Sequence, residues 1–213
     1  MATRFRIVAA LAVWFGLVLQ YWLVITGSIG PGPVERTVNF FSYFTIPTNL
    51  LAALAMTLPW LAPQSAAGQF FSRPSVRTAI AGYMIIVIGV VYFILRHLEN
   101  LQGWDLVADV ILHYVTPVLF VIDWLFFVPK GTSKLRHMAA WLAYPIAYLV
   151  WTVAHGAPTG FYPYPFLNVG ELGFQRVLAN MAGLLVVFVL VGLLLIAADR
   201  VIGRGARTAK LPN

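Results

Sequence analysis

The sequence predicts an all-α, polytopic membrane protein with six transmembrane helices and both termini on the cytoplasmic side. Three observations support this prediction. Hydrophobic residues make up 61% of the 213 residues and charged residues 10%, the apolar residues form long runs, and Lys and Arg gather in alternate connections. The mean hydropathy of +0.84 is far above that of soluble domains.

The apolar runs have the length that a helix needs to cross a membrane, which is ~20 residues. They lie at residues 6–26, 38–61, 78–96, 105–128, 137–155 and 174–202. Because the connections are short, we expect residues 1–213 to form a single membrane domain. Arg4 and Arg6 stand at the beginning of the first run, where a signal peptide also carries basic residues. The run is, however, longer than the apolar core of a signal peptide, and Tyr21 and Trp22 near its end suit cleavage poorly. We therefore expect this run to remain a helix.

The net charge of +7 is distributed unevenly among the connections. With the N-terminus inside, the outer connections hold only Arg36, Arg96 and Arg176. The inner segments hold Arg4, Arg6, Arg73, Arg77, Lys130, Lys134, Arg136, Arg200, Arg204, Arg207 and Lys210. This asymmetry is the positive-inside pattern of membrane proteins. The basic charge is thus explained by orientation and by contact with lipid headgroups, and we expect no nucleic-acid partner.

The second run contains an unusual set of polar residues in the stretch FFSYFTIPTNLLAAL, residues 40–54. Ser42, Thr45, Thr48 and Asn49 are three and four residues apart, so they share one face of a helix. Polar side chains are costly in hydrocarbon, and this face is expected to point into the bundle. Pro47 has no N–H, so we expect it to leave the carbonyl of Tyr43 unbonded and to kink the helix.

The fourth run carries a second polar face, formed by Asp105, Asp109, His113 and Thr116 at spacings of four, four and three. At ~1.5 Å of rise per residue, His113 and Thr45 lie at similar depths, ~10 to 12 Å below the outer surface. The outer ends of the fifth and sixth runs add His155 and Asn180. These residues predict a polar chamber in the outer half of the bundle, above an apolar inner half.

Simpler interpretations exist for some of these side chains. A Thr in a membrane helix usually bonds the carbonyl four residues earlier, which for Thr45 is that of Phe41, and Thr48 and Asn49 would commonly join neighbouring helices. Asp109 and His113 differ, because an ionisable pair within a membrane indicates a functional site by default.

Three segments of the chain resemble the androgen-induced-gene/androgen-dependent TFPI-regulating protein family, as a bacterial-type member of it. They are YFT at residues 43–45, HYVTP at residues 113–117, and YLVWTVAHGAPTGFYPYPFLN at residues 148–168. The resemblance implies six transmembrane helices and a threonine hydrolase of fatty acid esters of hydroxy fatty acids. By motif, the nucleophile falls on Thr45 and the base on His113. Thr48, one turn further on, is the alternative nucleophile.

This assignment is chemically reasonable. A Thr hydroxyl is a weak nucleophile that needs an adjacent base, and imidazole exchanges protons near neutral pH. Candidate orienting or stabilising residues are Asp109, Asn49, Asn180 and His155, together with the N–H groups near Pro47. The expected partners are membrane lipids and a long-chain acyl ester, which enters sideways from a bacterial cell membrane. The connection at residues 156–173 is expected to cover the chamber.

Other classes of protein remain as alternatives. A proton-coupled transporter or channel would use Asp109 and His113 as a relay, but it would need polar groups along the whole crossing, and the inner half offers little beyond Asp123. A metal-dependent hydrolase would use His97, His113 and His155. The chain has no Cys and no HExxH spacing, so we expect no metal or cofactor. A membrane protein without catalysis is the fourth alternative.

Overall fold

The computed structural model describes residues 1–27, 31–97 and 100–208, and for residues 206–208 only the backbone. Lys210, one of the inner basic residues, lies outside this part, as does the side chain of Arg207. The described residues are helical and contain no strand. The α-helices are α1 (Ala2–Thr26), α2 (Pro33–Phe41), α3 (Thr45–Leu61), α4 (Ala66–Ser72), α5 (Pro74–Val90), α6 (Gly103–Val110), α7 (Thr116–Phe127), α8 (His137–Thr159), α9 (Val169–Leu172) and α10 (Phe174–Thr208). Three further turns are η1 (Val91–Leu95) and η2 (Ile111–Val115), which are π-helical, and η3 (Pro165–Leu167), which is a 3₁₀-helix.

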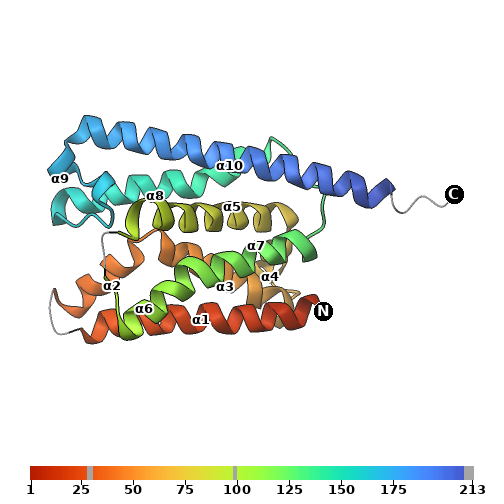
Figure 1. The fold of residues 1–213 in the computed structure, drawn as a ribbon, viewed down its shortest axis with the longest axis horizontal. Helices are drawn as coiled ribbons and strands as arrows, with labels where there is room; N and C mark the ends of the chain where they lie inside the picture. The colour runs from red at the N-terminus through yellow and green to blue at the C-terminus, as the bar shows by residue number, and fades with distance from the viewer. Residues whose placement is uncertain (28–30, 98–99, 209–213) are drawn as a thin grey trace.

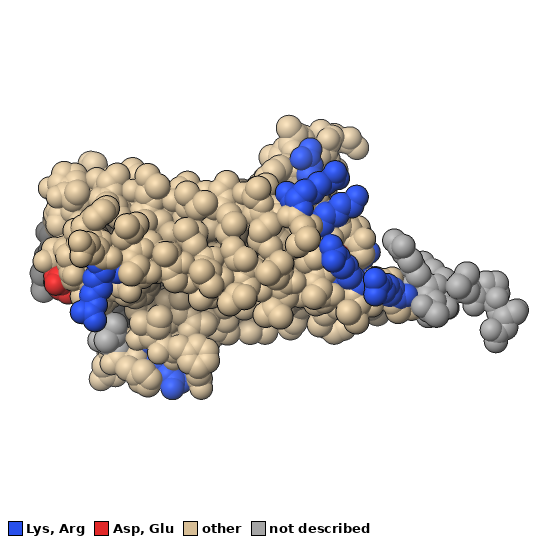
Figure 2. All heavy atoms as spheres, turned by 90° about the horizontal axis from the view of Figure 1, so that it is seen from above, with Lys and Arg blue, Asp and Glu red and all other residues tan. Residues whose placement is uncertain are grey.

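The long helices form an antiparallel bundle with α5 near its middle, in contact with α3, α7, α8 and α10 (Figure 1). The first residues of α1 and the last residues of α10 lie at the same end of the bundle. Lys and Arg side chains gather at this end, as Figure 2 shows. The helix α2 and the connection between α8 and α10 lie at the opposite end.

In the part of the chain that the structure describes, four helical segments are long and apolar enough to cross a membrane: α1, α5 with η1, α6 to α7 through η2, and residues Phe174–Gly205 of α10. The pair α2 and α3 passes the same test but is bent by 72°, so it is a fifth crossing if both belong to one span. These helices indicate an integral, multi-pass membrane protein. The helix α8 has sufficient length, but its Tyr, Trp, His and Pro residues lower its hydropathy, and it is not among these candidates.

The second predicted helix, residues 38–61, is two helices in the structure. The helix α2 ends at Phe41 and α3 begins at Thr45. The expected kink at Pro47 and the unbonded carbonyl of Tyr43 are therefore wrong, since the Ile46 N–H donates to that carbonyl at 3.2 Å. Pro47 lies in the first turn of α3, where backbone N–H groups have no partner within the helix and a Pro is tolerated.

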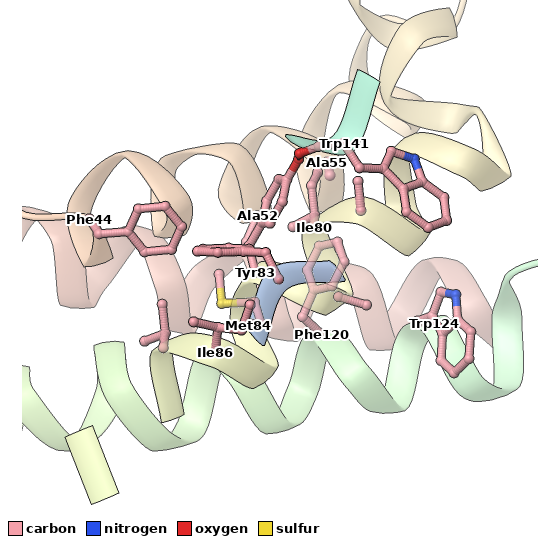
Figure 3. Close-up of a cluster of buried hydrophobic side chains, with 14 of the residues drawn as sticks. Phe44, Ala52, Ala55, Ile80, Tyr83, Met84, Ile86, Phe120, Trp124 and Trp141 are labelled. Carbon is pink, nitrogen blue, oxygen red and sulfur yellow. The ribbon is translucent and has the colours of Figure 1, made fainter. Parts of the chain in front are cut away.

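The core of the bundle combines large aromatic side chains with small residues. Phe44, directly before α3, Tyr83 and Met84 of α5, and Phe120 and Trp124 of α7 are all buried (Figure 3). Alanines on α3 and α5 are fully buried beside them, at positions 52, 53, 55 and 81. Small residues let membrane helices approach closely, which increases van der Waals contact.

The end of the bundle that holds the first residues of α1, predicted to be the apolar inner half and here called the inner end, is not apolar, contrary to the prediction. Asp123 of α7 is fully buried and accepts hydrogen bonds from Arg6 Nε at 2.6 Å and from Arg77 Nη2 at 2.5 Å. Arg77, expected in a connection, is 2% exposed within α5, and its Nη1 also donates to the carbonyls of Ala55 and Phe71 at 2.6 and 3.3 Å. This burial is feasible because both guanidinium groups are paired with the Asp123 carboxylate and also donate to backbone carbonyls.

Candidate active site at the start of α3

Thr45 is the first residue of α3, and its side chain is 6% exposed. Its Oγ1 lies 3.1 Å from His113 Nε2, within hydrogen-bonding distance. The break between α2 and α3 makes this contact possible, because it ends the continuous helix in which Thr45 was expected to bond the Phe41 carbonyl. The structure thus brings together the Thr and His that the sequence placed at one depth.

His113 lies in the π-turn η2, between α6 and α7. Single π-turns inside α-helices occur frequently at functional sites. The other ring nitrogen, Nδ1, lies 2.6 Å from Asp109 Oδ1 and 3.2 Å from the Asp109 carbonyl. Both partners of Nδ1 are acceptors, so Nδ1 carries the proton and Nε2 accepts from the Thr45 hydroxyl. The result is a carboxylate, an imidazole and a hydroxyl in one hydrogen-bonded line, as in nucleophilic hydrolases.

Thr48, the alternative nucleophile, points elsewhere. Its side chain is fully buried, and its Oγ1 lies 2.8 Å from the hydroxyl of Tyr144 on α8. This pair joins α3 to α8, and a tyrosine hydroxyl is not a base that could take the proton of Thr48. The geometry therefore favours Thr45 over Thr48 as a reactive hydroxyl.

Asn49 is fully buried and links two parts of the site by hydrogen bonds. Its Nδ2 donates to the carbonyl of Thr45 at 2.9 Å and to the carbonyl of Leu112 at 3.1 Å. Both donors are thus used in holding α3 against η2, immediately beside His113. Asn49 positions the pair and does not offer a donor to a ligand.

Asn180 and His155 are placed away from the hydroxyl and the imidazole. Asn180 Nδ2 donates to the carbonyl of Phe166 at 2.8 Å, which ties α10 to η3. His155 Nε2 lies 3.1 Å from Asn39 Oδ1, and its ring stacks on Trp151. Both residues make these contacts at the end of the bundle that holds α2 and the connection between α8 and α10.

The sequence missed Tyr164, which was assigned only to the covering connection between α8 and α10. Its hydroxyl accepts a hydrogen bond from the Phe44 N–H at 3.1 Å, at the beginning of α3. Its ring is stacked on Phe166 with centroids 5.3 Å apart. Burial raises the pKa of the Tyr164 hydroxyl to about 12, so the group stays protonated and can donate. The run YPYPF carries no signal that tells which Tyr turns inward.

Thr45 and Tyr164 line an apolar pocket whose space not filled by protein atoms, including the part open to the exterior, is about 420 Å³. Its other walls are aliphatic or aromatic side chains from α5, η1, α8, α10 and η3, namely Phe44, Ile86, Val87, Val90, Val91, Leu95, Tyr148, Phe166, Leu167, Leu184 and Phe188. No charged residue is among them. Such walls suit a hydrocarbon chain whose polar end stays at Thr45.

Within residues 1–27, 31–97 and 100–208, no group of three or more His, Asp or Glu side chains could hold a metal ion. Comparisons with known protein families, with curated proteins and with solved structures found no match.

Proposed function

We propose that the protein is an intramembrane lipid ester hydrolase with Thr45 as nucleophile and His113 as base, of the kind that the resemblance to the androgen-induced-gene family implies. The observation that carries this proposal is the 3.1 Å contact between Thr45 Oγ1 and His113 Nε2. Asp109 on the opposite ring nitrogen and the apolar pocket at Thr45 support it.

The reaction follows from these contacts. His113 Nε2 takes the Thr45 proton as Oγ1 attacks the ester carbonyl, and the resulting imidazolium is stabilised by the Asp109 carboxylate. The imidazolium then returns the proton to the departing alkoxide, which leaves as an alcohol, and the acyl group stays on Thr45. Water, deprotonated by His113, attacks this second ester and releases the fatty acid together with the free Thr45 hydroxyl.

The negative oxygen of each tetrahedral intermediate needs hydrogen-bond donors. Tyr164 supplies one, because its hydroxyl accepts from the Phe44 N–H and its own proton is available beside Thr45. The N-terminus of α3 supplies partial positive charge at the same place. In this role Tyr164 replaces Asn49 and Asn180, whose amide groups are engaged elsewhere.

We further propose six membrane crossings with both termini in the cytoplasm of a bacterial cell, counting α8 and the bent pair α2 and α3 as one crossing each. The gathering of basic side chains at the end that holds the first residues of α1 and the last of α10 supports this orientation (Figure 2). The site then lies in the outer half of the membrane. Its substrate is a long-chain acyl ester, such as a fatty acid ester of a hydroxy fatty acid, drawn from the bilayer.

Active-site labelling of the purified protein tests the hydrolase proposal. The wild type should react with a fluorophosphonate probe and release fatty acid from a long-chain ester, and Thr45→Ala and His113→Ala should do neither. Thr48→Val is the matched control, because it removes the neighbouring hydroxyl while keeping the site, and it should retain both activities. Labelling that survives in folded Thr45→Ala would refute the assignment, as would a folded wild type without either activity.

A proton-coupled transporter or channel with Asp109 and His113 as relay is the second candidate. The observation that favours it is the inner charged cluster around Asp123, since polar groups then occur in both halves of the bundle. Proton flux into liposomes that is lost in His113→Gln would support the relay. Absence of flux in a preparation that hydrolyses esters would exclude it.

A further inference from the structure

The apolar pocket at Thr45, here called the upper pocket, has a second pocket beneath it. This lower pocket lies between α5, α8 and α10, and its space not filled by protein atoms, including the part open to the exterior, is about 280 Å³. Its walls are again almost entirely apolar: Thr78, Ala79, Gly82, Tyr83, Ile86, Met138, Trp141, Leu142, Phe188, Val191, Gly192 and Leu195. Neither pocket has a charged residue in its lining.

The two pockets share Ile86 of α5 and Phe188 of α10. Both side chains are buried, with 5% and 6% of their surface exposed. The Phe188 ring is in edge contact with Phe44 at 5.6 Å and with Tyr83 at 6.2 Å between centroids, and Phe44, Tyr83 and Ile86 lie together in Figure 3. The partition between the pockets is therefore made of side chains alone, and a smaller residue at position 188 would join the two spaces.

We propose that Phe188, packed against Ile86, forms the floor of the acyl site and sets the longest fatty-acyl chain that the protein accepts. This inference rests on the proposed function, because it takes the upper pocket as the acyl site of the hydrolase. The polar end of the chain stays at Thr45 and Tyr164, so the methyl end points inward to the floor. The lower pocket is unused space that a longer chain could enter only past Phe188.

The dependence of binding on chain length follows from burial of hydrocarbon. Each buried methylene should raise affinity roughly fourfold, until the methyl end meets the floor. Beyond this length the added methylenes find no space, and affinity stops rising. With Phe188→Ala, the rise should continue through the lower pocket to a longer limit.

Equilibrium binding of saturated fatty acids tests this without relying on turnover. The measurement uses the folded protein with Thr45 intact, in detergent, and a series of fatty acids of increasing length, which contain no ester to cleave, competes with a fluorescent fatty acid. We expect Phe188→Ala to move the limit to longer chains and Phe188→Leu to move it less. Adding Ala79→Leu to Phe188→Ala fills the lower pocket and should restore the shorter limit. The control is Leu190→Ala, on the exposed face of the same helix, which should leave the limit unchanged.

A chain-length limit that is unchanged in both Phe188 variants would refute the role of Phe188 as the floor of the acyl site. A protein that binds no fatty acid would refute it as well. The hydrolase proposal fails separately, if the wild type neither labels nor turns over. A chain-length limit that shifts in the Phe188 variants of a protein without hydrolytic activity would support the role of Phe188 and refute the hydrolase proposal.

Discussion

Replacing Asp123 with Asn should destabilise the protein more than any other single change at the inner end of the bundle. The carboxylate is fully buried and bonds two guanidinium groups, at 2.6 Å to Arg6 and at 2.5 Å to Arg77. Asn keeps the shape and one acceptor but removes the negative charge. The two positive groups would then face each other in a site closed to water.

The magnitude follows from the burial of each partner. Breaking a buried ion pair by removing one member reduces the free energy of unfolding by about 3–5 kcal/mol. Arg77 is 2% exposed and would keep only uncharged partners, namely the carbonyls of Ala55 and Phe71, the Met56 sulfur and the Phe120 ring, so the full effect applies there. The Arg6 side chain is 20% exposed, and its removal leaves Asp123 paired, so Arg6→Gln should lose only about 1 kcal/mol.

Thermal unfolding in detergent at one heating rate measures the difference. For a chain of this size, about 3–5 kcal/mol corresponds to a midpoint lowered by roughly 6 to 20 °C. A common heating rate is required because unfolding of such proteins is commonly irreversible. Asp199→Asn is the matched control, since Asp199 is also a buried carboxylate at the inner end but forms no salt bridge with Arg6 or Arg77 and accepts the neutral N–H of Ser133 at 2.9 Å, which Asn can also do.

Two results would contradict the reasoning. The first is a midpoint for Asp123→Asn that falls no further than that for Asp199→Asn. The second is an equal loss in Arg6→Gln and Asp123→Asn, which would mean that the cluster is screened by water throughout.

Three further predictions concern the site. Asp109→Asn should lower kcat about 10- to 100-fold, because the negative charge that stabilises the imidazolium is lost. The backbone carbonyl of residue 109 still accepts from His113 Nδ1 and so keeps the tautomer. An unchanged kcat in ester hydrolysis would exclude this role. Thr48→Val should keep kcat but lower the free energy of unfolding by about 1–3 kcal/mol, because the Tyr144 hydroxyl loses its hydrogen-bond partner. Denaturant titration measures this free energy, and a fall in kcat with stability retained would contradict the prediction. Tyr164→Phe should lower kcat about 10²- to 10³-fold with little change in KM, and a change in KM alone would indicate a purely structural tyrosine. Burial raises the pKa of Tyr164 from 10.0 to about 12. The contribution of this group to stability is therefore present below pH 10 and lost toward pH 12. Between pH 10 and pH 12 the unfolding midpoint should fall less steeply in Tyr164→Phe than in the wild type.

Much of the helical architecture could be predicted because hydrophobicity is a property of the residues themselves. The predicted runs correspond to α1, α5, α6 to α7, α8 and α10, with ends displaced by a few residues. The sequence also predicted that Thr45 and His113 lie close together along the bundle, although the count assumed a continuous helix and α2 is bent by 72° from α3. Their 3.1 Å contact agrees with this count.

The remaining features depend on neighbours that are distant in the sequence. The break before Thr45 lies in a stretch as apolar as the helix after it, so hydropathy alone did not reveal it. Tyr164 reaches the start of α3 from 120 residues away, and periodicity within one helix says nothing about such a contact.

The sequence by itself determined which segments are apolar and long enough to form the main helices, because this depends on local composition. Only the tertiary structure decided that Thr45 meets His113 while Thr48 meets Tyr144, and that Asp123 is shared by Arg6 and Arg77. Residues one turn apart on α3 face different helices, and a buried charge requires a partner that only packing can bring to it.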